Sequence, residues 1–204
     1  MCIKKEKLDN KFLGSTTQNA PLEKFLAGRR LARLKNIYQG KQVLDFGCGL
    51  HGRAVAHMSK KAFIVHGVDP SIKKHLSGRN SLFSSLDDLQ GQKYDLITAF
   101  AVFEHIPPFQ LVDLLAAFHR MTSDNGLIFG TVPTPLSRPV LEFLSFKLKL
   151  IDSSQIKDHW VYYDDLWLQE IVALAGWRLA RYKKFQFGLN SEFKLIKSDC
   201  ADFS

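Results

Sequence analysis

The sequence predicts an α/β fold: a doubly wound, mostly parallel sheet of seven strands whose last strand is antiparallel. Three observations predict it. Short apolar runs alternate with helical patterns over most of the chain. A glycine-bearing turn separates the first apolar run from a helical pattern. The chain then ends on two extended runs joined by a short turn, which is typical of a hairpin.

In the first half, five elements follow an initial helix. That helix begins at Pro21 and ends at Gly40, with apolar residues at helical spacing. The expected elements after it are a strand at 42–46, a helix to about 61, a strand at 62–68, a short helix from about 71 and a weak strand at 81–83. Each apolar run is short enough for a buried strand.

The second half continues the alternation and then departs from it. A strand at 94–100 precedes a helix that starts at Pro107 or Pro108 and extends to Met121. Asn125 and Gly126 are expected to turn the chain into a strand at 127–132. The remaining elements are a helix capped by Asp164 or Asp165 and ended by Gly176, then strands at 177–187 and 192–197.

Composition supports a folded protein with a basic start. The chain has 204 residues, of which 46% are hydrophobic and 24% charged, so general disorder is excluded. The formal charge is +8, and residues 1–40 account for +6 of it, with 9 Lys or Arg against 3 Asp or Glu. Residues 41–146 carry only +1. We therefore expect a flexible basic segment at 1–20 and a single domain at 21–204.

Cysteine usage and hydropathy bear on the compartment. Cys2, Cys48 and Cys200 are scattered and match neither a disulfide framework nor a metal site, which favours the cytoplasm. No apolar run reaches the ~20 residues that a transmembrane helix needs. The longest, at 140–151, lies in a predicted insertion at 133–163. Three interpretations of this apolar run are open: a lid over a substrate site, a surface that contacts a membrane or a partner, or part of the core.

The glycine turn is the first candidate ligand site. Gly47, Gly49 and Gly52 form a Gly-x-Gly-x-x-Gly pattern between a strand and a helix, which is the dinucleotide fingerprint. Asp45, two residues before it, would oppose a pyrophosphate and suits a ligand that presents an ammonium group. A tight turn without a ligand role is the alternative.

A second carboxylate follows the next strand. Asp69 lies 20 residues after Gly49, where it can accept hydrogen bonds from the two hydroxyls of a ribose. Pro70 ends the strand and could border a base. The alternative is that Asp69 or Ser71 only caps the following helix.

Five segments, in order, resemble the motifs of small class I S-adenosylmethionine-dependent methyltransferases. They are Val-Leu-Asp-Phe-Gly-Cys-Gly at 43–49, Gly-Val-Asp-Pro-Ser at 67–71, Tyr-Asp-Leu-Ile at 94–97, Phe-Glu-His-Ile-Pro at 103–107 and Asn-Gly-Leu-Ile-Phe-Gly-Thr-Val-Pro at 125–133. The resemblance covers about residues 25–197, and its antiparallel last strand matches the terminal hairpin. His51 departs from the family, which often has glycine there.

The resemblance implies S-adenosylmethionine as cofactor, S-adenosylhomocysteine as product, and a role for each matching residue. Backbone at Gly47, Cys48 and Gly49 would contact the methionine portion, with Asp45 near its ammonium and Asp69 on the ribose. Other implied contacts are Pro70, Ser85 and Leu86 at the adenine, and Phe100 and Ala101 at the methionine end. Arg29 or Arg30 could pair with the cofactor carboxylate. No metal is implied.

Methyl transfer from a sulfonium requires mainly placement and exclusion of water. A general base is needed only for a poorly acidic hydroxyl or a protonated amine. His105, just beyond the strand at 94–100, and His159, in an aromatic stretch, are the candidates. The alternative to a base role for His105 is packing or helix capping. For Tyr162 and Tyr163, which follow His159 in the aromatic stretch, the alternative to a place in the acceptor region is packing.

The acceptor is expected to be a small or glycan-like molecule methylated at oxygen, and the basic start modestly favours an anionic one. An RNA methyltransferase and an NAD-binding oxidoreductase are the alternatives. The near-neutral charge of residues 41–146 disfavours a nucleic-acid partner. Asp45 and the terminal hairpin oppose the oxidoreductase.

Overall fold

The computed structural model describes residues 27–73, 80–139 and 160–198. Its strands are β1 (Gln42–Phe46), β2 (Ile64–Val68), β3 (Asn80–Phe83), β4 (Tyr94–Phe100), β5 (Thr122–Pro133), β6 (Trp177–Phe185) and β7 (Asn190–Lys197). Its α-helices with bounds are α2 (Arg53–Met58), α3 (Pro108–Met121) and α6 (Asp165–Ala173), and the 3-10 helices are η1 (Ala32–Leu34), η2 (Leu86–Leu89) and η3 (Phe103–His105).

The strands form one seven-stranded sheet in the order β3-β2-β1-β4-β5-β7-β6. Neighbouring strands from β3 to β5 are parallel, and β7 is antiparallel to both β5 and β6. The predicted fold class is therefore confirmed. The chain winds outward from β1 to β3 and then returns to β4 beside β1, so the strand order reverses between β1 and β4. In open α/β sheets, ligands bind outside the carboxyl ends of the strands at such a point.

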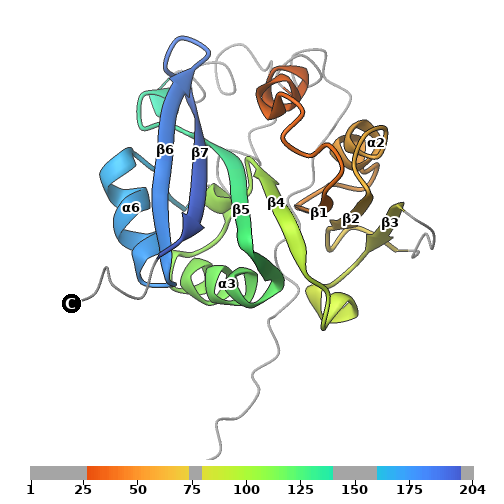
Figure 1. Cartoon of the computed structure of the whole chain (residues 1–204). Helices are drawn as coiled ribbons and strands as arrows, with labels where there is room; N and C mark the ends of the chain where they lie inside the picture. The colour runs from red at the N-terminus through yellow and green to blue at the C-terminus, as the bar shows by residue number, and fades with distance from the viewer. Residues whose placement is uncertain (1–26, 74–79, 140–159, 199–204) are drawn as a thin grey trace, which may run out of the picture.

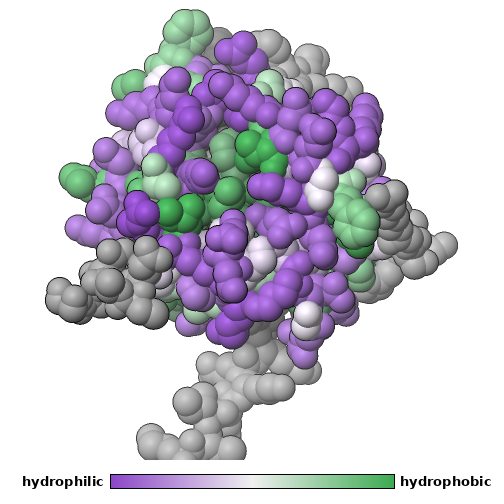
Figure 2. Space-filling view, in the orientation of Figure 1, coloured by the Kyte–Doolittle hydropathy of each residue, from purple (hydrophilic) through white to green (hydrophobic). Residues whose placement is uncertain are grey.

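Two layers of helix cover the sheet (Figure 1). Helices α3 and α6 pack on one face, where Leu115, Phe118 and Val172 are fully buried. The helical residues 27–34 and α2 pack on the other, burying Leu34 and Met58. On the face seen in Figure 2, hydrophobic residues gather near the centre, over β4 and β5, inside a rim of hydrophilic ones.

Local sequence explains the helices on the first face. Pro108 opens α3, where its fixed φ and missing N–H cost nothing. Asp164 caps α6, because its side chain accepts a hydrogen bond from the Trp167 backbone N–H at 2.8 Å. Helix α3 is tied to the sheet by Trp177 of β6, whose indole N–H donates to the Leu115 carbonyl at 2.9 Å.

Two predicted boundaries were wrong. The first helix does not extend to Gly40, because it passes into η1 and then reaches Lys35 and Asn36 in the left-handed region, at φ 45° and 65°. Strand β5 begins at Thr122 and not after a turn at 125–126. The Thr122 hydroxyl donates to the Phe118 carbonyl at 2.7 Å, so the chain passes directly from α3 into β5.

Smaller differences between the predicted and observed boundaries lie at the ends of other elements. Helix α2 ends at Met58 and β2 begins at Ile64, because the Ala62 N–H bonds back to the Met58 carbonyl. Residues 71–73 are not helical. The terminal turn falls at 186–189. Three expectations lie wholly or largely outside the described residues: the basic segment at 1–20, the apolar run at 140–151 and most of the insertion at 133–163.

A substitution at Gly130 tests the packing of the central strands. A Cβ there would lie 2.3 Å from the Phe193 ring and 2.5 Å from the Ala99 carbonyl oxygen, which is backbone and cannot move aside. Gly130→Ala should lower the free energy of unfolding by about 1–3 kcal/mol or more, measured by urea denaturation. Gly28→Ala is the control, since nothing lies within 4 Å of its Cβ position in the helical residues 27–31. Equal stability of the two variants would contradict this packing.

Candidate active site

The glycine turn lies over the carboxyl ends of β1 and β2. The backbone N–H groups of Gly47 and Cys48 both point to the Val68 carbonyl, at 2.8 and 3.2 Å. Gly47 has φ 74°, and a Cβ there would lie 2.4 Å from Val102, so both the conformation and the space require glycine. Gly49 and Gly52 also have positive φ, and Gly52 leads into α2. The turn therefore leaves bare backbone beside the strand-order reversal.

Asp69 holds this turn in place. One carboxylate oxygen accepts the Gly49 N–H at 2.8 Å, and the other accepts the Ser71 N–H at 2.9 Å. The Ser71 hydroxyl also donates to the second oxygen. An ionised carboxylate has about four acceptor positions, so about one is left for a hydroxyl donor of a ligand. The structure thus brings the two predicted motifs into direct contact. It also shows that Asp69 organises the turn after β2, although residues 71–73 do not form the helix that the capping alternative expects.

Asp45 is a buried carboxyl between the two central strands. It is 1% exposed, and one oxygen accepts the Thr98 hydroxyl of β4 at 2.6 Å. The other oxygen is buried and has no hydrogen-bond partner among the described residues. Burial raises the Asp45 pKa to about 7; the Thr98 hydrogen bond opposes this rise, and the charge of Asp69 adds to it. An ammonium group is the ligand that this oxygen would favour.

Cys48 contributes backbone and not a reactive thiol. Its side chain packs against the core beneath α2, and a Cβ on Gly67 would lie 2.9 Å from its sulfur. Burial and the nearby Asp45 and Asp69 raise the thiol pKa, so the thiol is protonated at neutral pH.

The next strand ends bring further predicted residues to the same edge. Ser85 caps η2 by accepting the Asp87 N–H at 3.1 Å, and Leu86 packs against the core. The Asp69 N–H donates to the Phe83 carbonyl at 3.1 Å, which ties the end of β3 to that of β2. Pro70 is exposed.

The exit from β4 is conformationally unusual. Ala101 has φ 55°, a left-handed conformation that is costly for alanine, and its N–H donates to the Thr131 carbonyl at 2.9 Å. Phe100, the last residue of β4, meets the Phe129 ring edge to face at 6.3 Å between centroids. Phe100 and Ala101 therefore end β4 and turn the chain away from the strand direction at the edge where the glycine turn lies.

His105 lies in η3, directly after this exit, and is half-buried. Its neighbour Glu104 is 2% exposed, and one Glu104 carboxylate oxygen has no hydrogen-bond partner among the described residues. Burial raises the Glu104 pKa, and the charges of His105 and Arg30 oppose the rise. His159, the other candidate base, lies outside the described residues.

Sequence reasoning missed two residues of this edge and left a third undecided. Thr98 is the hydroxyl that holds Asp45, and a lone threonine within an apolar strand is the signal for it. Glu104 was overlooked beside the more familiar histidine. Tyr163, for which the sequence left the acceptor region and packing both open, is fully buried, and its hydroxyl has no hydrogen-bond partner among the described residues. Burial and Glu104 raise its pKa.

The helical residues 27–34 bring arginines to the same region. Arg30 is half-buried, and its Nε has no hydrogen-bond partner among the described residues. Arg33 pairs with Glu192 of β7, which also binds Arg181 at 3.1 Å. Arg29 is exposed, which makes Arg30 the better placed of the two predicted arginines.

No group of three or more His, Cys, Asp or Glu side chains in residues 27–73, 80–139 and 160–198 is gathered as a metal ion would require. Within the same ranges, no helix is long and apolar enough to cross a membrane.

With this geometry established, comparison with known proteins identifies the family. A family model described as a methyltransferase domain matches residues 19–183. The chain belongs to the methyltransferase-domain family. The match spans all the residues of the glycine turn, Asp69 and η3, so the resemblance of the five motifs is confirmed.

Solved structures of methyltransferases share the fold. Magnesium protoporphyrin IX methyltransferase from Synechocystis, with bound S-adenosylhomocysteine, superposes with a TM-score of 0.57 and 15% identity, covering 86% of this chain and 83% of that one. A Burkholderia thailandensis 1,6-didemethyltoxoflavin N1-methyltransferase, also with S-adenosylhomocysteine, gives a TM-score of 0.62 and 16% identity, covering 89% and 80%. These bound molecules are consistent with S-adenosylmethionine as the cofactor of the present methyltransferase domain.

One curated relative is closer in sequence. An uncharacterized protein of Haemophilus influenzae is 30% identical over 123 residues, covering 52% of this chain and 47% of the relative. The chain therefore spans about half the length of this relative.

The pH dependence of cofactor binding tests the role of Asp45. The carboxyl is mostly protonated below its pKa of about 7, and an ammonium binds the ionised form better. S-adenosylmethionine affinity should therefore rise about tenfold between about pH 5.5 and about pH 7, by isothermal titration calorimetry. Asp45→Asn, which keeps an acceptor for Thr98, should abolish the rise. If the affinity of this variant still rose with pH as in the unchanged protein, the titrating group would be another residue.

Proposed function

We propose that this chain transfers a methyl group from S-adenosylmethionine to an oxygen atom of a small or glycan-like acceptor, and that it acts in the cytoplasm. The observation that carries the proposal is the arrangement at the strand-order reversal. There the glycine turn and Asp45, from the end of β1, and Asp69, from the end of β2, come to one edge of the sheet. The scattered cysteines, of which Cys48 is a free thiol in the described residues, support a reducing compartment.

The residues at this edge fit the cofactor. Gly47 offers bare backbone where a side chain would collide with Val102, and Asp45 has an unpartnered oxygen that suits an ammonium group. Asp69 retains acceptor capacity for a ribose hydroxyl, with Pro70, Ser85 and Leu86 proposed for the adenine. Arg30 could pair with the cofactor carboxylate. S-adenosylmethionine would supply the methyl on a sulfonium, which is already a good leaving group.

The acceptor side is proposed to be formed by η3 and the segment before α6. The Trp160 N–H donates to the Glu104 carbonyl at 2.8 Å, which brings that segment against η3. His105 would accept the proton that an acceptor hydroxyl loses as its oxygen takes the methyl group. Glu104 and Tyr163 offer further polar atoms for hydroxyls of the acceptor. His159 keeps its proposed place in this region.

An acceptor with an anionic group is favoured by the charge of the N-terminal side. Arg30 and Arg33 come from the helical residues 27–34, and residues 1–40 carry most of the net charge. A phosphate-bearing sugar or lipid would suit this basic side and the buried hydroxyl-binding groups. An NAD-dependent oxidoreductase is disfavoured, because Asp45 is buried where it would repel a pyrophosphate.

Asp69→Asn tests the ribose assignment. The amide keeps one oxygen for the turn but loses the charge that strengthens its hydrogen bonds, so the affinity for S-adenosylmethionine should fall by about 10- to 100-fold. Calorimetry would measure it, with thermal unfolding as a check on folding. Asp113→Asn, on the exposed side of α3, should bind as the unchanged protein does. Equal affinities would defeat the assignment.

A screen with methyl-labelled cofactor tests the reaction itself. The panel is sugar phosphates, quinone precursors, phospholipids and RNA, and label should transfer to a hydroxylated small molecule. With that acceptor, His105→Gln should lower kcat by about 10²- to 10⁴-fold while cofactor affinity stays the same. His119→Gln, near the opposite edge, is the control. Label transfer to RNA alone would favour the RNA alternative, and an undiminished kcat would remove His105 as the base.

A further inference from the structure

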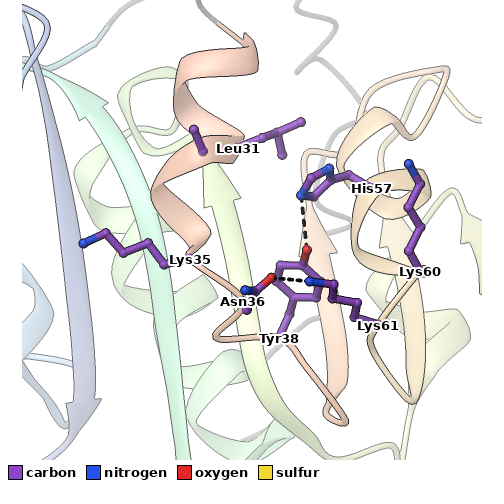
Figure 3. A pocket seen from close by; sticks show the side chains of 8 residues that line it. Leu31, Lys35, Asn36, Tyr38, His57, Lys60 and Lys61 are labelled. Carbon is purple, nitrogen blue, oxygen red and sulfur yellow. Dashed lines mark hydrogen bonds between the residues drawn. The ribbon is translucent and has the colours of Figure 1, made fainter.

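A second concave site lies away from the glycine turn. It is an open pocket of about 270 Å³ between the helical N-terminal segment and the end of α2. Figure 3 shows the two walls facing each other, with Asn36 and Tyr38 on one side and His57, Lys60 and Lys61 on the other. Helix α2 separates it from the cofactor edge, since the glycine turn precedes its first residue and the pocket adjoins its last turn.

The charge of this pocket is entirely of one sign. Three of the eight lining residues are lysines, one is His57, and none of the eight is acidic. The ammonium of Lys35 points away from the cavity, whereas Lys60 extends along the wall formed by the end of α2 and Lys61 reaches across to Asn36 (Figure 3). Cationic groups on one wall without a carboxylate beside them attract an anion.

Hydrogen-bonding groups span the pocket and fix its width. The Lys61 ammonium donates to the Asn36 side-chain oxygen at 3.0 Å, and the Tyr38 hydroxyl lies 3.2 Å from the His57 Nε2. Tyr38 is 4% exposed, so its ring is held by the core while its hydroxyl reaches the pocket. A bound anion would therefore meet donors already positioned on both walls.

The backbone of one wall is strained. Lys35 and Asn36 are consecutive non-glycine residues in the left-handed region, at φ 45° and 65°. Such residues each cost on the order of 1 kcal/mol or more, and they concentrate at functional sites. Here they turn the chain so that Asn36 and Tyr38 face α2.

We propose that this pocket binds a small phosphate-bearing anion, with Lys60 and Lys61 as its cationic side and the paired His57 and Tyr38 side chains as further hydrogen-bonding groups. A small solute is favoured over a membrane or a polymer because the donors line a hollow and not a flat surface. The site goes beyond methyl transfer, because none of its lining residues belongs to the cofactor or acceptor edge.

Calorimetry with inorganic pyrophosphate and the full chain tests the proposal. The double variant Lys60→Ala/Lys61→Ala should weaken pyrophosphate binding by about tenfold or more, because two charge-assisted hydrogen bonds are lost. Lys60→Arg/Lys61→Arg, which keeps the charges, should restore most of the affinity. The matched control is Lys183→Ala/Lys184→Ala, which removes two exposed charges from β6 and should leave binding unchanged.

A second arm separates a free phosphate from a lipid headgroup. Vesicles of phosphatidylcholine and phosphatidylglycerol should bind the unchanged protein and the Lys60→Ala/Lys61→Ala variant equally. Three results would overturn the proposal: no pyrophosphate binding, an equal loss in the β6 control, or a loss of vesicle binding without pyrophosphate binding. Each is independent of methyl transfer, because S-adenosylmethionine affinity should be unchanged in all these variants.

Discussion

The hydrogen bond from the Gly49 N–H to the Asp69 carboxylate, 2.8 Å long, is the interaction on which the site depends. It joins the turn after β1 to the turn after β2, and the Val68 carbonyl secures the same turn from below. Because these contacts use the glycine backbone, the turn needs no side chain of its own and stays open toward a ligand. The reversal of strand order between β1 and β4 supplies the space beside it.

A buried carboxyl completes this arrangement at an energetic cost. Asp45 and Thr98 come from the two strands that flank the reversal, and their hydrogen bond orients the acid toward the ligand edge. Burial raises the Asp45 pKa and so disfavours the ionised form without a cation beside it. Folding therefore favours the protonated acid, and this contribution to stability is lost as the pH rises through about 7. A cationic ligand would offset that loss.

The sequence was sufficient for the sheet and for the strand-end motifs because both are local patterns. Alternating apolar runs, glycines at a turn and an aspartate after each of two strands need no knowledge of distant contacts. What failed depended on tertiary contacts: Thr98 is recognisable only once β1 and β4 are adjacent. Lys35 and Asn36 end the first helix in a left-handed conformation that no helix-ending pattern in the sequence predicts. Glu104 and Tyr163 come together only through the packing of η3 against the segment before α6.

The central claim is that the edge formed by the ends of β1, β2 and β4 binds S-adenosylmethionine. Titration of ¹⁵N-labelled protein with S-adenosylhomocysteine, followed by amide resonances, tests it most directly. The amides of Cys48, Gly49 and Asp69 should move together and saturate, while those of Lys183 and Lys184 on β6 should stay in place. Movement of the same three amides with NAD, and none with S-adenosylhomocysteine, would contradict the account.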